Sequence, residues 1–188
     1  VIDLCAAPGG KTAQLSAAGA DVTAIEKEES RAVRLCENIT RMRATAETLV
    51  ADGLKWRPKA PVDAVLLDAP CSATGTFRRH PDVLWIKRPR DVTALAEGQD
   101  AFIDAARDML KPGGMLMYAV CSLQDEEGPD RIAAALERGG WKHVPFTDEE
   151  LADMAIARTP EGFFRTHPGP WWERGGMDGF FAARLIRV

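Results

Sequence analysis

Residues 1–12 read VIDLCAAPGGKT, and this stretch decides the fold. The apolar run Val1–Cys5 has the composition of a buried strand, and Lys11–Ala18 has helical spacing. Gly9 and Gly10 lie between them, where glycine lets the backbone turn tightly and approach a ligand closely. Their spacing fits neither the dinucleotide pattern G-x-G-x-x-G nor the Walker loop. The order of strand, glycine turn and helix indicates a nucleotide-cofactor loop, although a plain strand-to-helix turn would also explain the two glycines alone.

The rest of the chain alternates short β-branched runs with longer helical patterns, which is typical of a mostly parallel α/β sheet. We expect seven strands with helices on both faces of the sheet. The expected strands are Val1–Cys5, Asp21–Glu26, Glu47–Ala51, Val62–Asp68, Met115–Cys121, Lys142–Pro145 and Phe180–Val188. The expected helices are Lys11–Ala18, Glu29–Arg43, Pro89–Leu110 and Asp125–Arg138.

Length and composition indicate one globular domain over residues 1–188, with 46% hydrophobic and 28% charged residues. No apolar run approaches the ~20 residues of a membrane span, so no membrane association is expected. Four cysteines without paired spacing favour a reducing, cytoplasmic setting over a disulfide framework. Because the chain opens inside an expected core strand, we also expect that N-terminal sequence precedes it in the whole protein.

Two acidic residues end neighbouring expected strands and suit a nucleoside-bearing ligand. Glu26 ends the second strand, where a carboxylate accepts bonds from ribose hydroxyls. Asp52 ends the third, where it can accept a bond from an adenine amino group. Together with the glycine loop they fit S-adenosylmethionine. A solvated charge explains Glu26 alone equally well, and a turn before Gly53 explains Asp52 alone.

Two further cysteines follow expected strands in short motifs, Cys71 after Leu67-Asp68-Ala69-Pro70 and Cys121 after Tyr118-Ala119-Val120. A thiolate adds readily to carbon 6 of a pyrimidine, and this addition makes carbon 5 nucleophilic. Cytosine needs protonation or a strong hydrogen bond at nitrogen 3, and Asp68 is the expected acid, which requires a raised pKa.

The cysteines also have less specific explanations. Cys71 and Cys121 could form a redox pair, although neither lies in a Cys-x-x-Cys arrangement. Cys36 is expected to be a buried packing residue, and Cys5 to support the glycine loop.

Four motifs together resemble the RNA cytosine-5 methyltransferases of the RsmB/NSUN type: DLCAAPGGKT, DAPCSATGTFRRHPD, YAVCSLQDEEG and DGFFAARL. The resemblance implies a Rossmann-like methyltransferase fold with S-adenosylmethionine as methyl donor. It implies that Cys121 is the nucleophile and that Cys71 assists product release. It also implies that Asp68 contacts cofactor and target base. The cofactor-binding residues that it implies are Ala6, Ala7, Pro8, Gly9, Gly10, Lys11, Glu26, Arg31, Asp52 and Asp68.

The chain departs from the family pattern in three places. Val120 stands where the family usually has threonine before the nucleophile, and Glu26 where it more often has aspartate. The family also carries an RNA-binding region before the catalytic domain, and nothing in residues 1–188 corresponds to it.

A basic segment beside Cys71 is the expected RNA contact, because residues 77–90 hold five arginines and lysines with only Asp82 opposing them. Trp85 lies in this segment, where it could stack on a base or pack in the core. The expected substrate-binding residues are Lys11, Pro70, Arg78, Arg79, His80 and Lys87. His167 is a conceivable base, but an exposed loop histidine explains it at least as well.

The leading hypothesis is therefore an RNA cytosine-5 methyltransferase acting on ribosomal RNA, with transfer RNA close behind. One rival is a methyltransferase for a small molecule or protein, which the basic segment and Cys121 disfavour. Another is a non-catalytic cofactor-binding scaffold in ribosome assembly, which the intact cysteines and Asp68 disfavour. We expect a monomer and no metal ion.

Overall fold

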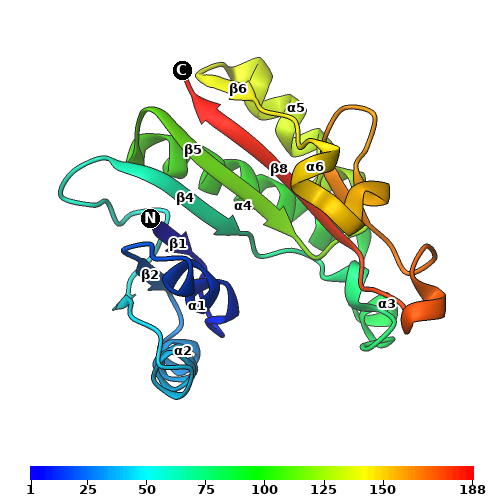
Figure 1. The fold of residues 1–188 in the computed structure, drawn as a ribbon, viewed down its shortest axis with the longest axis horizontal. Helices are drawn as coiled ribbons and strands as arrows, with labels where there is room; N and C mark the ends of the chain where they lie inside the picture. Colours follow the sequence, from blue (N-terminus) through cyan, green and yellow to red (C-terminus); the bar gives the residue numbers. More distant parts are fainter.

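An eight-stranded sheet forms the centre of the structure, a computed structural model that describes residues 1–188 (Figure 1). Seven strands follow the order β3-β2-β1-β4-β5-β8-β6, and β7 pairs with β8 outside this path. The strands are β1 (Ile2–Leu4), β2 (Thr23–Glu26), β3 (Glu47–Val50), β4 (Val62–Asp68), β5 (Leu110–Val120), β6 (Trp141–His143), β7 (Phe164–Thr166) and β8 (Phe180–Arg187).

The direction of the strands confirms the expected mostly parallel sheet. All four pairs among β1 to β5 are parallel, whereas β8 runs antiparallel to β5, β6 and β7. The seven predicted strands are all present, and Val62–Asp68 has the predicted bounds. The eighth, β7, was not predicted because it is a three-residue strand within a proline-containing connection.

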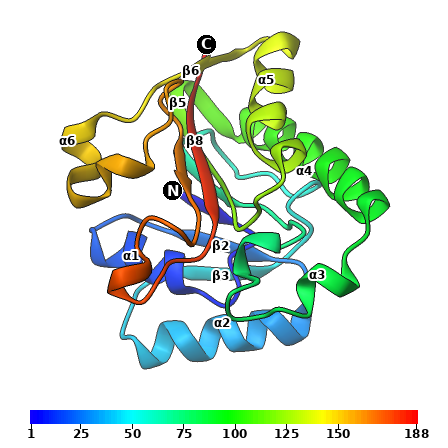
Figure 2. The same ribbon diagram turned by 90° about the vertical axis from the view of Figure 1, so that its right-hand side faces the viewer.

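Helices cover both faces of the sheet. Figure 2 shows α4 and α5 on one face and α1 and α6 on the other. The helices are α1 (Gly10–Ala17), α2 (Glu29–Arg41), α3 (Val83–Ile86), α4 (Pro89–Met109), α5 (Pro129–Arg138) and α6 (Asp148–Leu151). Short 3-10 turns span Thr74–Thr76, Asp125–Glu127, Ala152–Ala157 and Trp172–Arg174. None of the helices combines the length and apolar character needed to cross a membrane.

Sequence features fix where these helices begin. Pro89 is the first residue of α4, and the Asp91 carboxylate accepts a 3.0 Å bond from the Arg88 N–H, which would otherwise lack a partner. The predicted helix Asp125–Arg138 is wrong at its start, because Gly128 separates a 3-10 turn from α5. A Cβ on Gly128 would lie 3.1 Å from the Phe181 ring, so the chain passes tightly over β8 there.

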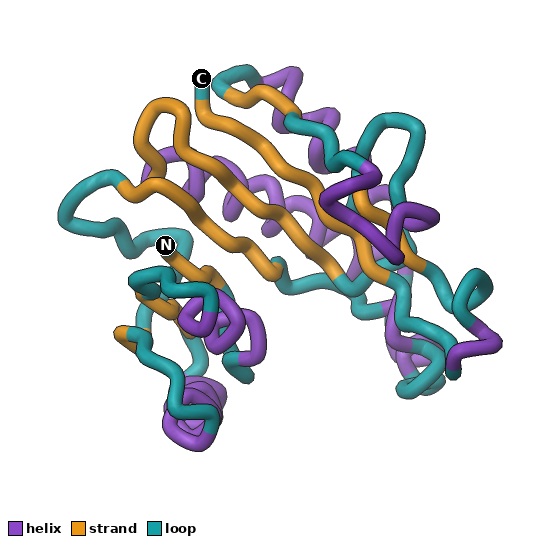
Figure 3. The backbone as a smooth tube through the Cα atoms, in the orientation of Figure 1, coloured by secondary structure: helices purple, strands orange, loops and turns teal.

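The main core lies between the sheet and α4. It contains 20 buried residues, including fully buried Leu67, Ile103 and Tyr118. Side chains of β8 alternate between half-buried and buried positions along most of the strand, as expected for a strand that is covered more fully on one face. This core fixes β4 and β5 side by side, and in Figure 3 both strands end on the side where the loop of residues 69–88 begins.

Two glycines form a close crossing of three chain segments beside those strand ends. The Gly75 N–H donates to the Cys121 carbonyl at 3.0 Å, and the Gly179 N–H donates to the Gly75 carbonyl at 2.7 Å. A Cβ on Gly75 would lie 2.0 Å from the Gly179 carbonyl oxygen. Only glycine therefore permits the segment before β8 to lie against both cysteine loops.

Candidate active site

The two cysteine motifs meet because they leave adjacent parallel strands. Asp68 pairs with Ala119 in the β4–β5 register, and the Ala69 N–H donates to the Ala119 carbonyl at 2.9 Å. The loops that follow bring the Cys71 and Cys121 Sγ atoms to 3.5 Å from each other. Both thiols are free and half-buried. The structure thus joins two residues that are 50 positions apart in sequence.

The contact between the thiols differentiates them. The Cys71 thiol lies at hydrogen-bond distance from Cys121, which lowers the pKa of Cys121 below that of an ordinary thiol. The same contact, together with burial, raises the pKa of Cys71. Of the two thiols, Cys121 is therefore the more readily ionised.

A cavity of about 180 Å³ contains both thiols and the Asp68 carboxylate, together with Arg31. The Lys11 ammonium donates to Asp68 at 2.6 Å, and both side chains are partly exposed. Lys11 comes from the first turn of α1, so the glycine loop directs its cation to the end of β4. The cavity therefore combines two thiols with a carboxylate that accepts a hydrogen bond from an ammonium group.

A second cavity, of about 280 Å³, shares Cys5, Arg31 and Pro70 with the thiol cavity. Glu26 and Asp52 both line it, as their positions at the ends of β2 and β3 predict. Its other lining residues include the apolar side chains of Ile25, Leu54 and Phe102. A pocket with two carboxylates and an apolar wall has the chemistry of a nucleoside site.

Both carboxylates also support the local backbone. Glu26 is buried, accepts a 3.3 Å bond from the Ala7 N–H and lies 3.5 Å from an Arg31 nitrogen. Asp52 accepts a 3.1 Å bond from the Leu54 N–H, and this bond, followed by Lys27, lowers the pKa of Asp52. Glu26 is therefore not a simple solvated charge, whereas Asp52 is a turn residue that also faces the cavity.

Side chains of α2 pack against the glycine loop and hold its backbone. Gly9 has a φ of 102°, a left-handed conformation, and a Cβ there would lie 2.8 Å from Leu35. The Asn38 amide donates to the Pro8 carbonyl at 2.9 Å, and Arg31 donates to the Ala7 carbonyl at 2.9 Å. The predicted cofactor loop is therefore a turn held by side chains of α2, and its conformation requires glycine at position 9.

Asp3 is a residue of this region that the sequence analysis did not single out. It is fully buried in β1, where Thr12 donates to one carboxylate oxygen at 2.6 Å and the other oxygen has no partner. With Lys11 and Asp68 it lines a third cavity of about 370 Å³. Burial raises its pKa to about 6. An acid within the apolar run VIDL is the sequence signal that could have identified it.

Replacement of Asp3 by asparagine should change how stability depends on pH. The folded protein binds the Asp3 proton more tightly than the unfolded chain, because the pKa rises from 3.8 to about 6. The contribution of Asp3 to the free energy of unfolding should therefore fall by ~3 kcal/mol as pH rises through this interval. Asp3→Asn keeps an acceptor for Thr12 without the charge, so its advantage over the wild type should grow from pH 4 to pH 7. Urea unfolding at several pH values measures the difference in stability between the variant and the wild type. A difference that does not change with pH would contradict this prediction.

The basic segment is less free than its sequence implied. Arg79 Nε donates to the Asp178 carboxylate at 2.7 Å, and Arg78 Nε lies 3.5 Å from the same group. Asp178 is buried, and its pKa is lowered by Arg79 first. Asp82 is the only acidic residue within the segment, but the fold adds Asp178, 99 residues from Arg79, as a second opposing charge. Arg78 and Arg79 therefore hold the chain before β8, and both side chains stay partly exposed.

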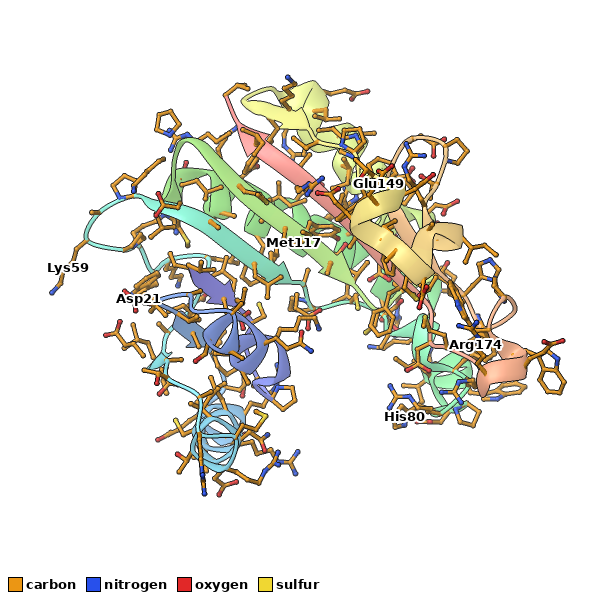
Figure 4. All side chains as sticks on the ribbon, in the orientation of Figure 1. Asp21, Lys59, His80, Met117, Glu149 and Arg174 are labelled. Atoms are coloured by element: carbon orange, nitrogen blue, oxygen red, sulfur yellow. The ribbon has the colours of Figure 1, made fainter.

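The remaining part of this segment faces outward. His80 is exposed, and Figure 4 shows it at the same end of the molecule as Arg174, far from Lys59. Trp85 in α3 is 88% exposed, so the alternative that it packs in the core is wrong. Lys87 lines a surface cavity with Thr74, whose hydroxyl accepts a bond from the Leu123 N–H in the Cys121 loop.

Three other candidates have simpler roles. Cys36 is exposed on α2, 3.2 Å from the Thr48 hydroxyl, so the expectation of a buried packing residue is wrong. The error arose because Leu35, one position earlier, takes the buried side of the helix. Cys5 packs against the core, and burial raises its pKa to about 12. His167 is exposed and lines none of the cavities described above.

The chain matches a family model and several named proteins over nearly its whole length. The family model described as "16S rRNA methyltransferase RsmB/F" matches residues 1–186. "Ribosomal RNA small subunit methyltransferase B" from Salmonella typhi is 42% identical over 198 residues, covering 100% of this chain and 42% of the relative. The protein of the same name from Yersinia pseudotuberculosis is 41% identical over 192 residues, with the same coverage. The chain thus spans less than half the length of these relatives.

Solved structures with the same fold include two from Pyrococcus horikoshii. NSun6 with SFG, an S-adenosylmethionine analogue, superimposes with a TM-score of 0.82 at 30% identity, covering 100% of this chain and 47% of that one. A methyltransferase homologue has a TM-score of 0.77 at 25% identity, covering 100% of this chain and 61% of that one.

Proposed function

This chain belongs to the 16S rRNA methyltransferase RsmB/F family, and from that premise we propose that it methylates carbon 5 of a cytosine in ribosomal RNA through a covalent cysteine adduct. The methyl donor is S-adenosylmethionine. The observation that carries the proposal is the Cys71–Cys121 pair, with its Sγ atoms 3.5 Å apart, in one cavity with Asp68. A reaction of this class works where ribosomal RNA is made, so we propose the cytoplasm as its location.

The chain's residues fit the cofactor. Glu26 and Asp52 line the 280 Å³ cavity, where they would accept bonds from the ribose hydroxyls and the adenine amino group. Ala6 and Gly10 line the neighbouring 370 Å³ cavity with Lys11. The nucleoside cavity adjoins the thiol cavity through Cys5, Arg31 and Pro70. S-adenosylmethionine, bound there, supplies an electrophilic methyl group beside the thiols.

Cys121 and Asp68 would activate the target base. The Cys121 thiolate forms a bond to carbon 6 of cytosine, and electron density moves toward nitrogen 3, where a proton must arrive. The Lys11 ammonium, which donates to the Asp68 carboxylate at 2.6 Å, can supply that proton through Asp68 and becomes a neutral amine. Carbon 5 is then nucleophilic enough to accept the methyl group.

Cys71 would act in the second half of the reaction. Its pKa is raised first by its contact with Cys121, where negative charge resides before the reaction. Once Cys121 is a neutral thioether, that charge is gone and Cys71 deprotonates more readily. It can then take the proton from carbon 5, so that the bond between carbon 6 and Cys121 breaks, Cys121 leaves as a thiolate, and nitrogen 3 returns its proton to Asp68 and Lys11. Cys121 is thus the thiolate before the attack on carbon 6, and Cys71 is the thiolate after methyl transfer.

RNA would approach over α3, next to the Cys71 loop. Trp85 is 88% exposed there, and Lys87 follows it at the edge of the cavity that reaches Thr74. An exposed indole beside a cation suits a stacked base and its phosphate. Single-stranded or loop RNA is the expected form, because the target cytosine must leave its stack to reach Cys121.

Trp85→Ala should therefore raise the KM for RNA about tenfold and leave kcat and the KM for S-adenosylmethionine unchanged, since one stacked base contributes ~1–3 kcal/mol. Trp172→Ala is the matched control, because Trp172 is also 76% exposed but lies on another turn. Steady-state kinetics with a ribosomal RNA fragment measure both variants. Equal effects of the two substitutions would contradict a specific role for α3.

Covalent trapping tests the proposed function. The protein is incubated with S-adenosylmethionine and RNA that carries 5-fluorocytidine, then separated on a denaturing gel. Fluorine at carbon 5 replaces the proton that must leave, so the adduct cannot resolve. A protein–RNA band is expected with ribosomal RNA, and a band only with transfer RNA would change the substrate. Absence of a band with every RNA would favour the non-catalytic scaffold.

A further inference from the structure

Glu127 is a buried carboxylate that the mechanism above does not use. It ends the 3-10 turn after the Cys121 loop and is 0% exposed. Its side chain forms no ion pair with a lysine, arginine or histidine. Four neutral hydrogen-bond donors surround it instead. A buried carboxylate is costly unless each oxygen is well bonded, so such an arrangement needs a reason.

The donors come from both cysteine loops. The Ser72 N–H donates to Oε1 at 2.8 Å and the Ser72 hydroxyl to Oε2 at 2.5 Å. The Ser122 hydroxyl donates to the same Oε2 at 2.5 Å. Ser72 directly follows Cys71, and Ser122 directly follows Cys121. One carboxylate thus holds the residue after each thiol.

Helix α4 completes the arrangement. The Gln99 amide donates to Glu127 Oε1 at 3.1 Å and to the Pro70 carbonyl at 2.9 Å. The Tyr118 hydroxyl lies 2.6 Å from the Glu127 carbonyl and 3.1 Å from Gln99 Oε1. Glu127 therefore lies between two loops and a core helix, and all of its side-chain partners are fixed by buried elements.

We propose that Glu127 is a positioning residue that sets the separation of the Cys71 and Cys121 thiols, an inference that rests on the proposed two-cysteine reaction. Both oxygens are needed, because Oε2 accepts from the two hydroxyls while Oε1 accepts from the Ser72 N–H and Gln99. Glutamine has a similar shape but one acceptor oxygen. Its NH₂ would face the Ser72 N–H and the Gln99 amide in the place of Oε1, or the hydroxyls of both loops, which would have to turn, in the place of Oε2. The loops would then shift relative to each other.

The consequence is measurable at Cys121. Contact with the Cys71 thiol is the first cause of its lowered pKa, and that contact depends on distance. Loosening of the loops should weaken the contact and make Cys121 harder to deprotonate. A role in folding alone would change stability without this change in thiol chemistry.

The experiment is alkylation of the full chain by iodoacetamide over a range of pH, without RNA or cofactor, with each cysteine followed by peptide mass spectrometry. Glu127→Gln should move the Cys121 profile upward by about one pH unit and slow methyl transfer at least tenfold, with an unchanged KM for S-adenosylmethionine. Exposed Cys36 is the internal reference. Glu126→Gln, one position earlier and exposed, is the matched control and should leave the Cys121 profile unchanged.

Ser122→Ala keeps the test decisive if Glu127→Gln does not fold, because it removes one of the four donors and should move the Cys121 profile in the same direction. An unchanged Cys121 profile in a folded variant would overturn the proposal. The two ideas fail separately. A shifted profile in a protein that traps no RNA overturns only the methyltransferase function, and an unshifted profile in one that traps RNA overturns only the role of Glu127.

Discussion

Replacement of Cys121 by alanine is expected to abolish methyl transfer, with a loss on the order of 10⁴-fold or more, as for other enzymes that lose a nucleophile. No protein–RNA adduct should form, because Cys121 is the more readily ionised of the two thiols. Cys71→Ala should behave in the opposite manner. Its adduct should form more slowly, because Cys121 loses the contact that lowers its pKa, but it should persist even on ordinary cytidine, because the group that removes the carbon 5 proton is missing.

Denaturing gels and methyl incorporation from labelled S-adenosylmethionine distinguish these variants. Cys36→Ala is the control, since Cys36 lies on the exposed side of α2 and should leave both readouts unchanged. A persistent adduct in Cys121→Ala and none in Cys71→Ala would reverse the two roles.

Gly75→Ala should cost at least ~3 kcal/mol of folding free energy, at the upper end for overpacking. The added Cβ would lie 2.0 Å from the Gly179 carbonyl oxygen, so backbone rather than a flexible side chain must move. The 2.7 Å and 3.0 Å backbone bonds at this crossing would be strained together. Urea unfolding followed by tryptophan fluorescence measures the change.

Gly98→Ala is the control with the opposite sign. Gly98 lies within α4, and a Cβ there meets nothing within 4 Å. Alanine in a helix is favoured over glycine by ~0.5–1 kcal/mol, so this variant should gain stability. Similar stability of Gly75→Ala and the wild type would show that the crossing can relax.

The sequence predicted the fold well because its signals were local. Hydrophobic runs between turn residues located all seven main strands, and Pro89 located the start of α4. The predicted ends of helices were wrong where tertiary contacts determine them. Gly128 ends the 3-10 turn because it passes over Phe181, a residue that is distant in sequence.

The site could be predicted only in part for the same reason. Each cysteine lies in a recognisable motif at the end of a strand, and parallel strands bring such ends together. Nothing local connects Ser72 to Glu127, 55 residues away, or Arg79 to Asp178, 99 residues away. A carboxylate in the acidic run Asp125-Glu126-Glu127 resembles surface charge until the fold places one member in the core.

Strand β8 enters the sheet between β5 and β6, although it is the last strand in the chain. During synthesis, the edges of β5 and β6 that pair with β8 therefore stay unpaired until residues 180–187 have left the ribosome. Gly179 reaches the Cys71 loop in the same step, so the nascent chain carries both thiols without the Gly75–Gly179 contact while residues 122–179 are made. Chaperones that cover unpaired strand edges would then act on this protein late, in the interval between emergence of β6 and arrival of β8.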